Sequence, residues 1–201
     1  MNQKTAMKLF GLLGLLMLLS CGYADRHRNS SLCEQALVDS LEVRVQDSLF
    51  SNVHYSRSQL LEALTQTQDS LVYYRLLALY GKTFFVSSDF DSILYYNRRV
   101  KEFSRNASQS SESLQSPRWN DVLSDVYNIE GNVWMQLNRP DSAITDYKKA
   151  YEYRLKGKKL HLLPDICINT ADAYLHRSDL AHTASYYRRA LFLCDSLNLS
   201  E

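Results

Sequence analysis

The chain has 201 residues and a formal net charge of +1, with 23 Lys and Arg against 22 Asp and Glu. No stretch is basic enough to neutralise a run of phosphates, which argues against nucleic-acid binding by this part of the protein. Of the six glycines, three lie within the first 22 residues, so the rest of the chain has few helix breakers. No segment shows sustained strand alternation, and the sequence therefore predicts an all-α fold.

The first 20 residues have the pattern of a secretory signal peptide. Two lysines precede an apolar run over 9–19 that is about half as long as a membrane span requires. The tetrapeptide Leu18-Leu19-Ser20-Cys21 resembles the lipobox of bacterial lipoproteins, which implies cleavage before Cys21 and acylation of its thiol. An ordinary signal peptide with a nearby cysteine is the alternative. We expect a signal peptide over 1–20, a lipid-anchored tether over 21–31, and a location on the bacterial cell envelope outside the cytoplasm.

Helical spacing of apolar residues predicts the elements that follow the tether. A degenerate N-terminal helix pair is expected over 32–68, then helix-pair repeats over 69–103, 119–157 and 158–201, with a serine-rich loop over 104–118. Asp-Ser-apolar triplets recur, and Asp69, Asp91 and Asp141 are expected to cap helix starts. These triplets also resemble an O-glycosylation acceptor, but capping already explains them. The last helix is apolar around most of its circumference, so we expect the native chain to continue with further repeats, or this helix to pack against a partner.

Three segments share one internal register. Gly81, Gly131 and Ala171 are each followed 3 residues later by an aromatic residue. Positions 12 residues and 19 residues after each small residue hold further packing residues. The aromatic residues are Phe84, Trp134 and Tyr174; the later positions hold Ile93, Ala143 and Thr183, then Val100, Ala150 and Ala190; Tyr147 and Tyr187 lie between them in two copies.

This register resembles the tetratricopeptide repeat (TPR), and the middle copy, with Tyr127, Gly131, Trp134, Ala143, Tyr147 and Ala150, is closest to it. The departures are Glu130 where the family prefers leucine, Asn97 for an aromatic, Thr183 for alanine, and copy spacings of 50 and 40 residues against a family period of about 34. The resemblance implies a right-handed superhelical stack of antiparallel helix pairs, a TPR-like α-solenoid in which small residues allow close crossings and aromatic residues fill the gaps. An unrelated helical bundle is the alternative.

The first helices of such pairs would line a concave groove. The groove candidates are Arg75, Lys82, Asn128, Asn132, Met135 and Asp172, a mixture of polar and apolar side chains that suits a protein or peptide ligand. Asn132 matches the asparagine of the family's carboxylate-binding type, but Asn128 replaces its basic residue, so a C-terminal carboxylate ligand is not implied. Five tyrosines fall outside the packing positions and are candidates for a ligand surface: Tyr73, Tyr95, Tyr151, Tyr153 and Tyr186.

The sequence lacks the patterns of catalytic and cofactor sites. It has no nucleophile elbow, no phosphate-binding glycine loop and no histidine pair at metal-ligand spacing, so we expect no enzyme activity, no metal and no cofactor. Cys167 and Cys194 lie in helical apolar patterns and are expected to be free thiols. The layout resembles the N-terminal sensory region of bacterial membrane-associated TPR regulators, which implies a protein–protein interaction scaffold or sensory module in a signalling or transcription-regulatory protein. The alternative is an outer-membrane lipoprotein for glycan capture or envelope protein assembly.

Overall fold

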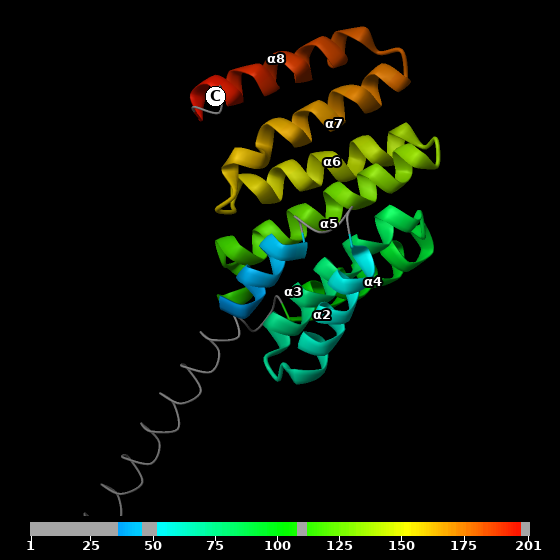
Figure 1. Ribbon diagram of the computed structural model, residues 1–201. Helices are drawn as coiled ribbons and strands as arrows, with labels where there is room; N and C mark the ends of the chain where they lie inside the picture. The colour runs from blue at the N-terminus through cyan, green and yellow to red at the C-terminus, as the bar shows by residue number, and fades with distance from the viewer. Residues whose placement is uncertain (1–35, 46–51, 108–111, 198–201) are drawn as a thin grey trace, which may run out of the picture.

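The computed structural model describes residues 36–45, 52–107 and 112–197, and in these ranges every regular element is a helix (Figure 1). The all-α prediction is confirmed for this part of the chain. A helical segment over 36–45 precedes the α-helices α2 (Val53–Gln66), α3 (Ser70–Lys82), α4 (Phe90–Ala107), α5 (Pro117–Gln136), α6 (Pro140–Leu155), α7 (Leu163–His176) and α8 (Leu180–Ser196). Short 3₁₀ helices η1 (Thr83–Ser87), η2 (Glu112–Gln115) and η3 (Leu160–Leu162) lie between them.

The predicted signal peptide, the acylation of Cys21 and the tether fall outside the described residues. Within those residues, no helix combines the length and the apolar character that crossing a bilayer requires.

Helix starts are set by side-chain caps and by prolines. Asp69 caps α3 as predicted, accepting hydrogen bonds from the backbone N–H groups of Leu71 and Val72. The predicted caps Asp91 and Asp141 are wrong, because both lie one position inside their helices. Asp89 accepts from the Ser92 N–H at 3.1 Å instead, and α6 begins with a proline after Arg139, which makes no side-chain cap hydrogen bond.

The predicted serine-rich loop over 104–118 is also shorter than expected. Helix α4 continues to Ala107 and α5 begins at Pro117, capped by Ser116. Ser104 is buried, and its Oγ accepts a hydrogen bond from Trp119 Nε1 at 3.0 Å. A serine-rich composition favours a loop in general, but residues 104–107 continue α4 by about one turn.

The same turn closes each of three helix pairs, α3/α4, α5/α6 and α7/α8. Ser88, Asn138 and Ser178 have positive φ values of 53°, 55° and 59°. In the middle turn the Asn138 N–H donates to Met135 O at 3.0 Å and the Arg139 N–H donates to Trp134 O at 2.8 Å. The equivalent bonds occur in the other two turns, so all three carry the Schellman arrangement that satisfies the last carbonyls of a helix.

The two helices of each pair cross at the same place in the register. A Cβ at Gly131 would overlap the Tyr147 ring, and a Cβ at Gly81 would lie 2.9 Å from Tyr96 Cβ. Ala171 is fully buried at the equivalent position. The residues 12 and 19 positions further on are buried in all three pairs: Ile93 and Val100, Ala143 and Ala150, Thr183 and Ala190. The small residues therefore permit close approach of the paired helices.

The later helices stack more closely than the earlier ones. Helices α5 to α8 lie side by side and reverse direction at each turn (Figure 1). The buried residues Ile144, Tyr147, Ile166 and Tyr174 form one core across α6 and α7. Helices α4 and α5 meet more sparsely, although α3 and α5 share a core that contains Leu77 and Trp119. The wider spacing leaves room beside α5 for segment 36–45 on one side and for an open cleft on another.

Candidate functional site

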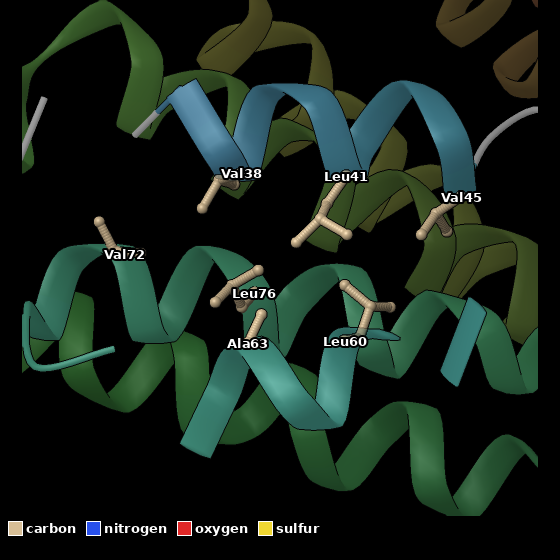
Figure 2. Packing of buried hydrophobic residues seen from close by; sticks show 7 residues of the cluster. All are labelled: Val38, Leu41, Val45, Leu60, Ala63, Val72 and Leu76. Atoms are coloured by element: carbon tan, nitrogen blue, oxygen red, sulfur yellow. The ribbon is translucent and has the colours of Figure 1, made fainter. Parts of the chain in front are cut away.

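Segment 36–45 lies in a groove formed by α2, α3, α5 and the connection between α6 and α7, which we call the helix groove. On its apolar face, Val38, Leu41 and Val45 are each at most 3% exposed. They point toward Val72 and Leu76 of α3 and toward two residues of α2, Leu60 and Ala63 (Figure 2). The spacing of three and four residues presents one face of a helix. The segment is therefore held as an amphipathic helix.

The acidic residues of the segment meet basic residues of the groove. The Asp39 carboxylate accepts a hydrogen bond from Arg75 Nη2 at 2.8 Å and lies 3.2 Å from Arg118 Nη2. Glu42 is paired with Lys159. Arg118 and Asp39 are 40% and 45% exposed, and ion pairs of this exposure contribute about 0–1 kcal/mol. Each buried apolar side chain contributes roughly 1.5–3 kcal/mol, so the three apolar residues stabilise the docked segment more than this ion pair does.

A cavity of 50 Å³ lies under the segment, lined by its Val38, Glu42 and Val45 and by residues of α3, α4 and α5. Two buried polar atoms belong to residues of this lining, Arg75 Nη1 and Asn97 Oδ1, and neither makes a hydrogen bond within the described part of the chain. Packing between groove and segment is therefore incomplete, and the lining offers one donor and one acceptor. A bound helix whose polar side chain reaches this cavity would be able to hydrogen-bond with these two atoms.

A buried ion pair holds Lys159 in position. Arg154, on α6, donates to Asp121 at 2.7 Å and also pairs with Asp125. Asp121 in turn accepts from the backbone N–H groups of Lys158 and Lys159 at 2.9 and 3.2 Å. A side chain at Gly157 would overlap Asp121, so glycine is needed for this close approach. The connection after α6 is thus fixed against the start of α5.

The sequence-predicted groove residues divide into two groups. Arg75 and Lys82 line the cavity under segment 36–45. Three others hydrogen-bond within the stack: Asn128 Oδ1 accepts from Asn169 at 3.1 Å, Asn132 accepts from the Tyr147 hydroxyl at 2.7 Å, and Asp172 accepts from the Tyr187 hydroxyl. Met135 packs against the α6/α7 core. The two tyrosine bonds occupy equivalent positions in successive pairs, and they direct these side chains toward their own partner helix.

Other residues of the groove were not predicted. Asp39, Glu42, Arg118 and Lys159 become partners only through the tertiary structure, since 117 residues separate Glu42 from Lys159. A sequence signal for this docking was present in segment 36–45. Its apolar residues recur at helical spacing with acidic residues between them, which is the pattern of an amphipathic helix. Among the surplus tyrosines, Tyr153 lines the separate cleft beside α4, whereas Tyr73, Tyr151 and Tyr186 pack against core clusters and Tyr95 is exposed.

The described residues form no metal site, and the two described cysteines are unpaired. No group of three His, Cys, Asp or Glu side chains in the described ranges is arranged to bind a metal. Cys167 and Cys194 are free thiols, as predicted. Burial raises the pKa of Cys167 to about 11, so this thiol is protonated at neutral pH and unreactive.

Comparisons with known proteins assign no family. No protein-family model matches the chain, and no curated protein is significantly similar to it. Among solved structures, the crystal structure of BtubC (BKLC) from P. vanneervenii is similar at 15% sequence identity and a TM-score of 0.41, covering 88% of this chain and 85% of that one. A likeness this low carries no argument about function, which rests here on the geometry of the groove.

Proposed function

We propose that the protein is a non-catalytic scaffold of TPR-like helix pairs on the bacterial cell envelope that binds an acidic amphipathic helix in the helix groove. The observation that carries the proposal is segment 36–45, which is seated there by three buried apolar residues and two acids. The groove thus holds a helix from its own chain. A helix with the same pattern on a partner protein, or on a neighbouring copy, has the chemistry to replace it.

Two further features support the TPR-like part of the proposal. Three successive helix pairs share one turn, one crossing residue and one set of buried positions. The third residue after each small residue also makes an equivalent contact: Phe84 stacks on Tyr96, Trp134 donates to Asp146 at 2.8 Å, and Tyr174 stacks on Tyr186. Repetition of this kind is typical of helix-pair solenoids, in which each unit contacts its neighbours. The envelope location rests on the lipobox resemblance around Cys21.

Because the segment is tethered to its groove, its effective concentration there is high, and a free helix competes poorly with it. The test therefore uses the full mature chain with Leu41→Asp, which removes an apolar anchor of the tethered segment. A fluorescein-labelled peptide of residues 34–47 is titrated with this variant and fluorescence anisotropy is measured. We expect saturable binding that is stronger than to the wild-type chain.

Two matched variants in the Leu41→Asp background test the charge pairing. Arg118→Glu removes a groove cation and is expected to weaken peptide binding about fivefold. Arg188→Glu reverses an exposed arginine on α8, away from the groove, and should leave binding unchanged. The proposal fails if a scrambled peptide binds equally well, or if both charge reversals have the same effect.

A further inference from the structure

A second concave site lies on a different side of α5 from the helix groove. This cleft, of 410 Å³, lies between α4 and α6 with α5 as its floor, and its volume falls in the range of small-ligand sites. The α5 residues Tyr127, Glu130 and Trp134 line it at spacings of three and four residues, so they share one helix face. The residues that line the helix groove from α5, such as Val122 and Ile129, belong to another face.

The floor of the cleft is aromatic. Tyr127 and Tyr153 stack with ring centroids 5.6 Å apart and planes 6° from parallel, and Trp134 lies two helical turns beyond Tyr127 along α5. Both tyrosines are only half-buried. The ammonium groups of Lys101 and Lys149 lie 5.2 and 5.1 Å from the centroid of the Tyr127 ring, so the half-buried Tyr153 supplies the apolar area for the C–H face of a ring-shaped ligand.

The walls of the cleft are charged and excess positive. Arg98, Lys101, Arg105 and Lys149 line it against Glu102 and Glu130. Lys101 donates to the buried Glu130 at 2.6 Å and is neutralised by it, and Lys149 lies 3.5 Å from Asp146. Arg98 and Arg105 are exposed and make no ion pair with another described residue. They lie two turns apart on the same face of α4, so two guanidinium groups face the cleft with no acidic partner among the described residues.

We propose that this cleft binds a sugar acid, that is, a polyhydroxylated ring carrying a carboxylate. The arginines pair with the carboxylate in the bidentate manner that guanidinium favours. The ring lies against the tyrosine pair, and its hydroxyl groups donate to the exposed carboxylate of Glu102. An aromatic acid without hydroxyl groups would satisfy the arginines and the tyrosines, but it offers no hydrogen-bond donor to Glu102. The mixture of cations, acceptors and aromatic rings therefore favours a sugar acid.

The site provides its own reporter. Trp134 lines the cleft, whereas Trp119, the other tryptophan, is 1% exposed in the core. Intrinsic fluorescence of the full mature chain is followed while galacturonic acid, or its linear trimer, is added at low salt. We expect a saturable change in Trp134 emission with either probe. Tighter binding of the trimer assigns the site to a glycan chain, and equal binding assigns it to the free sugar acid.

Three controls make the result decisive. Galactose, which lacks the carboxylate, should give no saturable change. Arg98→Gln combined with Arg105→Gln should weaken galacturonate binding at least about tenfold, since charge-assisted hydrogen bonds are lost. Arg188→Gln, an exposed arginine of α8, should leave it unchanged. Binding of galactose as tight as that of galacturonate, an unaltered affinity in the double variant, or no fluorescence response at all would overturn the proposal. Peptide binding in the helix groove is independent of each of these outcomes.

Discussion

The two halves of the molecule use the same helix-pair unit in different ways. From α5 to α8 the pairs stack closely, and the α6/α7 core is continuous. From α3 to α5 the pairs are spread, with segment 36–45 in one gap and the open cleft in another. The α6–α7 connection is held by Arg154 and Asp121, and no comparable buried ion pair joins α4 to the start of α5 among the described residues. The difference suggests that the way successive pairs are connected decides which surfaces remain open for binding.

The largest expected effect comes from breaking the buried ion pair between Arg154 and Asp121, which lies in the closely stacked half. Arg154→Met leaves the buried Asp121 carboxylate without its cationic partner, and removal of one member of a buried pair costs about 3 kcal/mol or more. Urea denaturation of the full chain measures the free energy of unfolding. Arg98→Met, at an exposed arginine of α4, is the matched control and should change it by less than about 0.5 kcal/mol. A loss of unfolding free energy below about 1 kcal/mol for Arg154→Met would contradict a stabilising role for the Arg154–Asp121 ion pair.

A second comparison concerns the stability cost of replacing Gly131 or Gly81 by alanine. Gly131→Ala places a Cβ against three atoms of the Tyr147 ring, whereas Gly81→Ala approaches Tyr96 Cβ at 2.9 Å. We expect a loss of about 2 kcal/mol for Gly131→Ala from overpacking and less than about 1 kcal/mol for Gly81→Ala. Denaturant midpoints of the two variants give the comparison. Equal losses would mean that the two crossings are equally close.

A smaller gain is expected at the shared turns. Ser178 has a φ of 59°, a conformation that glycine adopts without steric cost. Ser178→Gly should stabilise the chain by about 0.5–1 kcal/mol, and Asn138→Gly by less, because asparagine tolerates this region. Thermal unfolding of these variants is compared with that of Ser178→Ala, which keeps the steric penalty. No difference between the glycine and alanine variants would show that the turn is not under strain.

The smallest expected effect is a pH dependence of stability that arises from Glu130 of α5. Burial raises the pKa of Glu130 despite the nearby Lys101 ammonium. A carboxyl whose folded-state pKa is raised binds protons more tightly in the folded state than in the unfolded state. Its destabilising effect is therefore absent below the unfolded pKa of 4.5, develops as pH rises above that value, and is complete above the folded pKa. The stability of the wild-type chain relative to Glu130→Gln should therefore increase as pH is lowered from 7 toward 4.5. A relative stability that falls over this interval would contradict the assignment.

The sequence predicted what depends on local pattern and missed what depends on tertiary structure. Gly81, Gly131 and Ala171 could be placed because small residues at a fixed interval from aromatic residues carry their own signal. The caps at Asp91 and Asp141 were misplaced because the turn before each helix, with its positive φ at Ser88 and Asn138, was not recognised.

The candidate sites were harder to predict than the fold. Arg75 and Lys82 were expected in the groove, but the docking of segment 36–45 between α3 and α5 brings together residues far apart in sequence, as Glu42 and Lys159 show. Asn132 and Asp172 were expected to face a ligand, yet each accepts a hydrogen bond from a tyrosine hydroxyl of its own helix pair. The first outcome depends on how neighbouring pairs are spaced, and the second depends on how the two helices of one pair pack against each other.

We expect segment 36–45 to occupy the helix groove as a replaceable ligand and not as a fixed part of the core. Amide hydrogen exchange of the full mature chain, followed segment by segment at increasing urea, tests this most directly. The account predicts that residues 36–45 exchange through a local opening with a lower free energy than α5 to α8, and that an excess of the 34–47 peptide carrying the wild-type sequence speeds their exchange. Exchange of residues 36–45 only with global unfolding, unaffected by the peptide, would contradict it.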